Sequence, residues 1–75
     1  MDNRELQRAL NSIGKACFIK YYEMFRDRSR TDALAVVDYL MKSESFTEAG
    51  AKIRVQYAKA IFNANRQNDG LNIIV

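Results

Sequence analysis

Apolar residues recur every three or four positions along most of the chain, and this spacing limits the fold more than any other feature. Residues three and four apart lie on the same side of an α-helix, whereas a half-buried strand requires strict alternation. Such alternation is absent from most of the sequence, which also contains no proline. The chain is therefore predicted to be all-α. In the first third, the positions with helical spacing are Leu6, Leu10, Ile13, Cys17, Tyr21 and Met24.

The spacing predicts a small bundle of three main helices within a single domain, residues 1–75. The first helix covers about residues 3–27. The segment NSIG, residues 11–14, weakens it, because Asn, Ser and Gly are poor helix formers. The first helix is thus either continuous or broken near Gly14, into pieces at residues 3–11 and 13–27.

A polar loop, residues 26–32, separates the first helix from the second, which ends near Lys42. Either Ser29, which has capping-box spacing to Asp32, or Thr31 is the expected N-cap residue. The positions of the second helix that are expected to face inward are Ala33, Val36, Val37, Leu40 and Met41.

Residues 43–45 are expected to form a short turn before the third helix, which runs from Glu48 to about Asn65. Thr47 is a good N-cap residue, and Phe46 is placed to pack on Ala51 as a hydrophobic staple. The buried stripe of the third helix is predicted to be Ala51, Val55, Ala58, Ile61 and Phe62.

The C-terminal segment begins with NRQNDG, residues 65–70, whose Asn-Asp-Gly sequence predicts a turn that ends the third helix. A short apolar tail, LNIIV at residues 71–75, follows. Exposing four apolar side chains to water is unfavourable, so a floppy tail is not expected. The tail either docks on the core as a short helical turn or pairs as a strand with a partner chain.

The composition indicates the cellular compartment in which the protein is expected. With one cysteine, Cys17, no intrachain disulfide can form, which favours a reducing cytoplasm. The charged start, MDNRELQR, is unlike a signal peptide, and no apolar run approaches the roughly 20 residues of a membrane span. A cytoplasmic protein with no membrane partner is therefore expected.

Few residues suit catalysis or metal binding. The chain contains no His, which removes the usual general base near neutral pH, and Cys17 lies on the apolar stripe as a core residue. Glu23 and Asp27 share a helix face, but no further metal ligand is spaced nearby. Gly14-Lys15 lacks the other residues of a phosphate-binding P-loop. No enzymatic activity, cofactor, metal site or small-molecule substrate is expected.

Charge is distributed unevenly along the chain. Residues 31–48 carry a net charge of −3, whereas residues 49–68 carry four basic residues and no acid. A basic segment next to an acidic one either meets an anionic partner or pairs with its own neighbour.

One face of the third helix carries side chains suited to nucleic acid. Gln and Asn can bond adenine bidentately, Lys can reach guanine or phosphate, and an α-helix fits the major groove. The spacing i, i+4, i+7, i+11 directs these side chains the same way, and Arg66 extends the stripe if the helix reaches it. The stripe is Lys52, Gln56, Lys59 and Asn63.

The segment ALAVVDYLMKSESFTEAGAKIRVQYAKAIF, residues 33–62, resembles a helix-turn-helix unit, in which a short turn joins two helices. The resemblance implies that the third helix enters the major groove of double-stranded DNA, with Thr47, Lys52 and Gln56 nearest the bases. Arg28 and Arg30, in the loop before the second helix, would then bind a phosphate.

The apolar content, 48% with eight aromatic residues, is generous for so short a chain. A bundle of three short helices cannot easily hide all of it, so a homodimer through the first helix, the tail or both is expected. The alternative function is accordingly a homodimeric, non-enzymatic protein–protein adaptor. The expected interface residues are Phe18, Tyr22, Phe25, Leu71, Ile73 and Ile74, with Val75 beside them.

Overall fold

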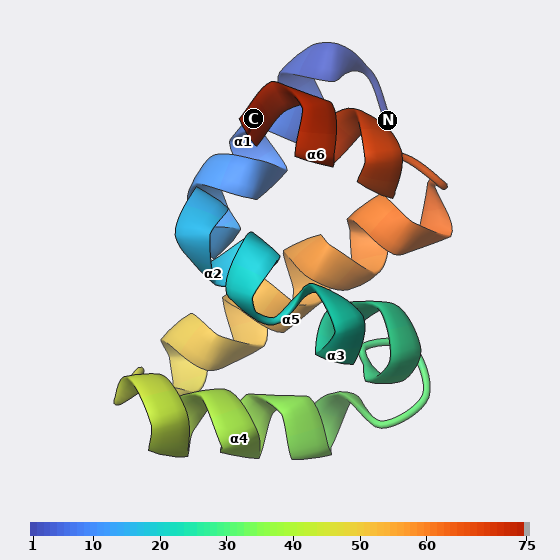
Figure 1. Ribbon diagram of the computed structural model, residues 1–75. Coiled ribbons are helices and arrows are strands. Elements are labelled where there is room, and N and C mark those ends of the chain that lie inside the picture. Colours follow the sequence, from blue (N-terminus) through green and yellow to red (C-terminus); the bar gives the residue numbers. More distant parts are fainter. Residues whose placement is uncertain (75) are drawn as a thin grey trace.

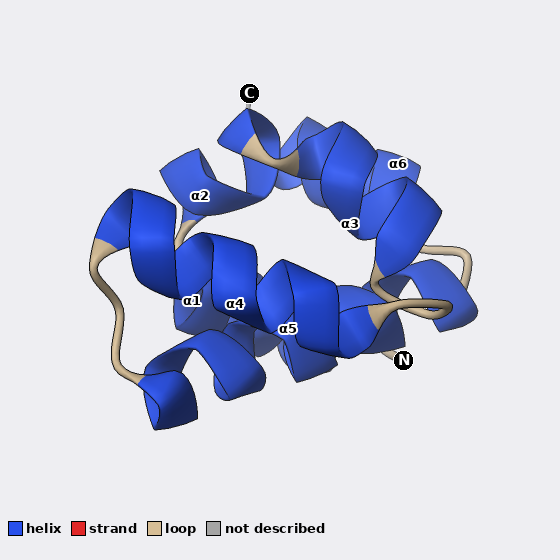
Figure 2. Ribbon diagram, turned by 90° about the horizontal axis from the view of Figure 1, so that it is seen from below, coloured by secondary structure: helices blue, strands red, loops and turns tan. Residues whose placement is uncertain are grey.

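A computed structural model describes residues 1–74 and shows six α-helices and no strand in that part of the chain. The predicted all-α bundle is confirmed, and Val75 lies outside the described residues. Helix α5 runs through the middle, with α1 and α6 on one side of it and α4 on the other (Figure 1). Only short loops join the helices (Figure 2). Their bounds are α1 Asn3–Ile13, α2 Lys15–Lys20, α3 Tyr22–Arg28, α4 Ala33–Glu44, α5 Glu48–Asn63 and α6 Gln67–Ile74.

The predicted first helix is broken twice. The first break lies at Gly14, whose φ of 91° is a conformation that favours glycine, so the broken alternative is confirmed. The second break, at Tyr21, was not predicted. Tyr21 is only 8% exposed, and its hydroxyl donates to the Ser43 hydroxyl 3.3 Å away on α4. The three short helices therefore wrap around the core where one long helix would extend past it.

Both predicted N-caps of α4 are wrong. Ser29 is fully buried, and its hydroxyl donates to the carbonyl of Phe25 instead. The Thr31 hydroxyl also bonds backwards, to the carbonyl of Asp27 at 3.3 Å. Asp32 occupies the N-cap position without a side-chain hydrogen bond. These two hydrogen bonds continue the pattern of α3 past its end at Arg28, so the loop before α4 begins later than the predicted residue 26.

The turn between α4 and α5 lies at residues 45–47, later than predicted. The Ser43 hydroxyl donates to the carbonyl of Tyr39 at 2.8 Å, inside α4, and Ser45 ends the helix with a φ of 58°. Thr47 is confirmed as the N-cap of α5, because its hydroxyl accepts the Gly50 N–H at 3.1 Å. Helix α5 ends at Asn63, before the predicted Asn65.

The predicted turn at residues 65–70 is confined to Asn65 and Arg66, since Asn-Asp-Gly lies inside a helix, and the helical alternative for the tail is confirmed for residues 71–74. Asn65 adopts a φ of 57° and reverses the chain, and α6 then begins at Gln67. Gly70 is buried against α1, where an added Cβ would lie 3.5 Å from Leu10. Residues 71–74 are therefore the end of a helix that packs on α1, and both chain ends lie on the same side of the molecule (Figure 1).

The core combines residues from the first five helices. All five predicted inward residues of α5 are buried, and the Phe18 ring stacks on Phe25 at 6.3 Å and on Phe62 at 6.0 Å. The buried apolar residues are Leu6, Ala9, Leu10, Ile13, Phe18, Tyr21, Phe25, Val36, Val37, Leu40, Ala51, Val55, Ala58, Ile61 and Phe62.

Two residues assigned to a dimer interface belong to this core. Phe18 and Phe25 are fully buried within one chain, so they need no second chain to cover them. The assignment assumed three helices, whereas residues 1–74 form six, which enclose both rings. The other expected interface residues within residues 1–74 are partly buried and pack against the core; they are Tyr22, Leu71, Ile73 and Ile74.

Candidate nucleic-acid interface

The polar stripe of Lys52, Gln56, Lys59 and Asn63, called the α5 ridge below, is exposed along its whole length. Its four side chains are solvent-exposed, while the opposite face of α5 forms the centre of the core. At 3.6 residues per turn they lie within an arc of about 60° and extend over about 16 Å of helix. The Thr47 cap begins the helix before Lys52, so all four side chains lie on one continuous helix, where their spacing places them on the same side. The structure thus brings Lys52, Gln56, Lys59 and Asn63 together as the sequence predicted.

The two lysines of the ridge differ in their surroundings. The ammonium of Lys52 lies 2.9 Å from the carboxylate of Glu48, one turn earlier. The hydrogen bond from Lys52 lowers the pKa of Glu48, so this pair is ionised at neutral pH. Lys59 has no carboxylate partner among the ion pairs of residues 1–74. Lys59 is therefore the ridge cation most available to an external anion.

Arg66 does not extend the ridge, contrary to the sequence prediction. Helix α5 ends at Asn63, and the reversal at Asn65 turns Arg66 back towards the chain ends. Its guanidinium donates to Asp69 at 2.7 Å, to the side chain of Asn3 and to the carbonyl of Met1. With its side chain only 23% exposed, Arg66 joins α6 to the start of α1.

Arg28 and Arg30 are exposed, but they lie away from the start of α5. Arg28 ends α3 and Arg30 lies in the loop to α4. This loop meets the beginning of α4, whereas Thr47 follows its other end (Figure 1). Twelve helical residues separate the two sites, a length of about 18 Å. These arginines can therefore contact a phosphate well away from Thr47, not one beside it.

A shallow groove between α4 and α5 borders the Lys52 end of the ridge. It has a volume of about 210 Å³, and Leu34 on its rim is 77% exposed. Asp38 also lines it and pairs with Lys42 at 2.9 Å. The surface next to the ridge is therefore apolar and partly acidic. The residues lining the groove are Leu34, Val37, Asp38, Met41, Glu48 and Lys52.

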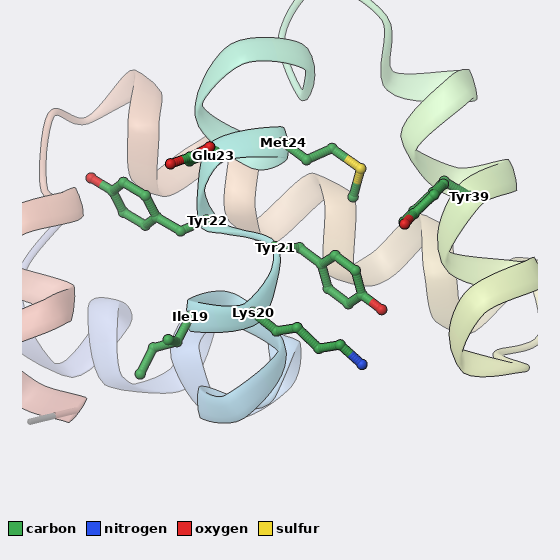
Figure 3. A pocket seen from close by; sticks show the side chains of 7 residues that line it. All are labelled: Ile19, Lys20, Tyr21, Tyr22, Glu23, Met24 and Tyr39. Atoms are coloured by element: carbon green, nitrogen blue, oxygen red, sulfur yellow. The ribbon is translucent and has the colours of Figure 1, made fainter.

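A larger hollow, of about 440 Å³, lies at the break between α2 and α3, lined by residues 19–24 and Tyr39. Met24 and Tyr39 approach each other across it, while Tyr22 points the opposite way from Tyr21 (Figure 3). Lys20 pairs with Glu44 at 3.5 Å, and the Tyr21 hydroxyl bonds to Ser43. Two of its polar groups are thus already bonded within the chain.

The outer side of α1 carries a second polar and basic face that the sequence analysis missed. Arg4, Arg8 and Asn11 are all exposed, and the spacing i, i+4, i+7 places them on one side of the helix. The same spacing pattern had identified the α5 ridge. In α1, however, the apolar stripe on the opposite side of the helix gives the stronger periodic signal. These three residues are called the α1 ridge below.

The remaining candidate groups have ordinary surroundings. Cys17 is partly buried, and this burial raises the pKa of its thiol. Asp27 pairs with Arg26 at 2.8 Å, and that hydrogen bond lowers the pKa of its carboxyl. Within residues 1–74 no three His, Cys, Asp or Glu side chains are grouped as metal ligands would be. None of the six helices combines the length and apolar character needed to cross a bilayer.

Comparison with known proteins adds no family to this description. No protein-family model, curated protein or solved structure matches the chain. The fold and the exposed surface define a small all-α protein whose central helix presents a polar ridge to solvent.

Proposed function

We propose that this protein binds double-stranded DNA and that α5 enters the major groove. The observation that supports this is the exposure of all four side chains of the α5 ridge on one side of a single helix. Lys, Gln and Asn are residue types that bond base edges and phosphates in that groove. The ridge is also the continuous polar part of a helix whose other face is fixed in the core, so its side chains start from a rigid support.

The junction before α5 supports the same assignment. Residues 45–47 link α4 to α5, and a short link of this kind occurs in helix-turn-helix proteins, whose second helix reads the groove. In this arrangement Thr47, Lys52 and Gln56 lie in the half of α5 nearest the bases. Arg28 and Arg30, at the far end of α4, contact a more distant phosphate, and Arg66 takes no part.

The pair between Lys52 and Glu48 makes the two lysines unequal in this proposal. Lys52 has to give up a solvent-exposed ion pair with Glu48 before it can contact DNA. Lys59 gives up no such pair. The charge of Glu48 also repels the phosphate backbone at the start of α5. Lys59 is therefore expected to contribute more to DNA affinity than Lys52.

The test is the binding of random-sequence duplex DNA, measured by fluorescence anisotropy at about 50 and 200 mM salt. Micromolar binding that weakens steeply with salt is expected, because bound lysines release counterions. Lys59→Ala should weaken binding several-fold and Lys52→Ala somewhat less. Lys42→Ala is the matched control, because Lys42 on α4 also pairs with a carboxylate four residues earlier at 2.9 Å. An equal loss from Lys42→Ala, or no binding at 50 mM, would overturn the proposal.

A protein–protein adaptor is the second candidate, and the groove between α4 and α5 favours it. Leu34 is a large apolar side chain that is 77% exposed, and exposed apolar side chains beside a groove are typical of protein interfaces. The anisotropy experiment separates the two functions when the mass of the protein in solution is recorded alongside. A stable dimer that binds no DNA at low salt is the result expected of the adaptor.

A further inference from the structure

The basic side chains of this protein fall into two groups. Five of them pair with carboxylates, at Lys20, Arg26, Lys42, Lys52 and Arg66. Of the exposed cations outside these pairs, Arg4 and Arg8 lie one turn apart on α1. Gln7 and Asn11 beside them are also exposed and uncharged. The α1 ridge is thus a second surface at which external anions meet cations that form no ion pair within residues 1–74.

The α1 ridge points away from the core. At 3.6 residues per turn, its three residues lie about 180° from the centre of the buried face of α1. That face is fully buried and packs on α5 and α6. The α1 ridge therefore faces away from α5, on the side of the molecule opposite α4 (Figure 1). The buried residues of α1 are Leu6, Ala9, Leu10 and Ile13.

The α5 ridge points in a different direction. It lies about 120° around α5 from the centre of that helix's buried face, on the side where Glu48 and Lys52 border the groove with α4. One straight duplex cannot lie along both ridges, because the core separates them. The shorter dimensions of the molecule, 21 and 18 Å, set the scale of that separation.

We propose that the α1 ridge binds a second segment of duplex DNA, so that one protein molecule bridges two duplexes. This inference rests on the proposed function, because α5 has to hold the first duplex. Arginine suits the contact, since its planar guanidinium bonds phosphate oxygens bidentately without reading the sequence. Asn11 and Gln7 add neutral hydrogen-bond donors for the same backbone.

Two features of the structure allow a second duplex to approach. The shorter dimensions of the molecule, 21 and 18 Å, exceed the Debye length of about 10 Å at 0.1 M salt, so repulsion between duplexes held on different faces is largely screened. The acids nearest in sequence lie to the side of the ridge. The Asp2 carboxylate is the N-cap of α1 and accepts the N–H of Glu5 at 2.8 Å. The Glu5 side chain lies on the flank of the helix. Neither acid pairs with Arg4 or Arg8 in the structure.

The experiment immobilises one biotinylated duplex on beads and measures how much of a second, fluorescent duplex the full chain retains there. The variant is Arg4→Gln combined with Arg8→Gln, which removes two exposed charges and leaves polar, helix-favouring side chains in their place. The control, Arg26→Gln with Lys42→Gln, removes two exposed cations that already pair with acids. Binding of each protein to a single duplex is followed by anisotropy in parallel.

The wild-type chain is expected to retain the second duplex. The α1 variant should lose that retention by about tenfold or more while its affinity for a single duplex changes by less than about threefold. The control variant should keep both activities. This pattern would assign the second contact to the α1 ridge.

Other results overturn the inference in distinguishable ways. Binding of a single duplex without retention of a second removes the bridging proposal and leaves the α5 proposal standing. Retention that survives in the α1 variant means that another surface, such as the α5 of a second copy, holds the second duplex. Equal losses in the variant and the control mean that net charge alone matters. No binding of any duplex removes both proposals.

Discussion

The two ends of α5 hold their charged side chains in different ways. At its start, Glu48 and Lys52 pair within a single turn, and Thr47 caps the helix locally. Beyond its end, Arg66 bonds Asn3 and the carbonyl of Met1, which are more than sixty residues away in sequence. A cation becomes part of the framework where another part of the chain comes within reach, and it stays available to solvent where only its own helix does. Arg66 therefore belongs to the framework of the fold, whereas Lys52 and Lys59 stay available to solvent.

The first prediction tests this difference directly and carries the largest expected effect. Arg66→Ala should lower the free energy of unfolding by about 1–2 kcal/mol, because a guanidinium that is only 23% exposed loses its hydrogen bonds to three exposed acceptors. Lys59→Ala, on the exposed ridge, should change it by no more than about 0.5 kcal/mol. Urea unfolding of both variants measures the contrast. Equal effects would mean that the two ends of α5 do not differ in this way.

The second prediction concerns the packing that brings Arg66 to the start of α1. Gly70 lies inside α6, and a Cβ added there would meet Leu10 at 3.5 Å, an ordinary van der Waals distance. Gly70→Ala should therefore stabilise the protein by about 0.5–1 kcal/mol, since alanine favours helix and restricts the unfolded chain.

Thermal unfolding measures this effect, and Gly70→Val is the contrasting variant. The larger side chain should lower the melting temperature, because the buried space beside Leu10 holds one added carbon but not three. If alanine also lowered the melting temperature, α6 would pack on α1 more closely than described.

The parts of the fold that follow from local signals were predictable. Gly14 and Thr47 are a helix breaker and a helix cap by residue type alone, and both act as predicted. The apolar spacing also identified the buried face of α5 correctly. Because a helix with a known start and a known buried face has a fixed outer face, the exposure of the α5 ridge followed as well.

The parts that depend on distant contacts were not predictable. Nothing in the residue type of Tyr21 indicates a helix break; its burial and its bond to Ser43 accompany the break. Helix α6 begins within a segment rich in turn-forming residues, and it is held by contacts with α1 and by Arg66. The prediction that Arg66 extends the ridge required α5 to continue beyond Asn63, where the helix in fact ends.

The smallest expected effect concerns the local pair at the start of α5. The hydrogen bond from Lys52 lowers the pKa of Glu48 below its ordinary value, so the pair stabilises the fold when Glu48 is ionised. That contribution is complete above the unfolded-state pKa of Glu48 and is lost as the pH falls through its lower folded-state pKa. The difference in stability between the wild type and Lys52→Ala should therefore be small at pH 7 and should disappear in acid. Urea unfolding from pH 7 to pH 2 measures it, and a difference that persisted unchanged at pH 2 would show that Lys52 stabilises α5 by something other than its pair with Glu48.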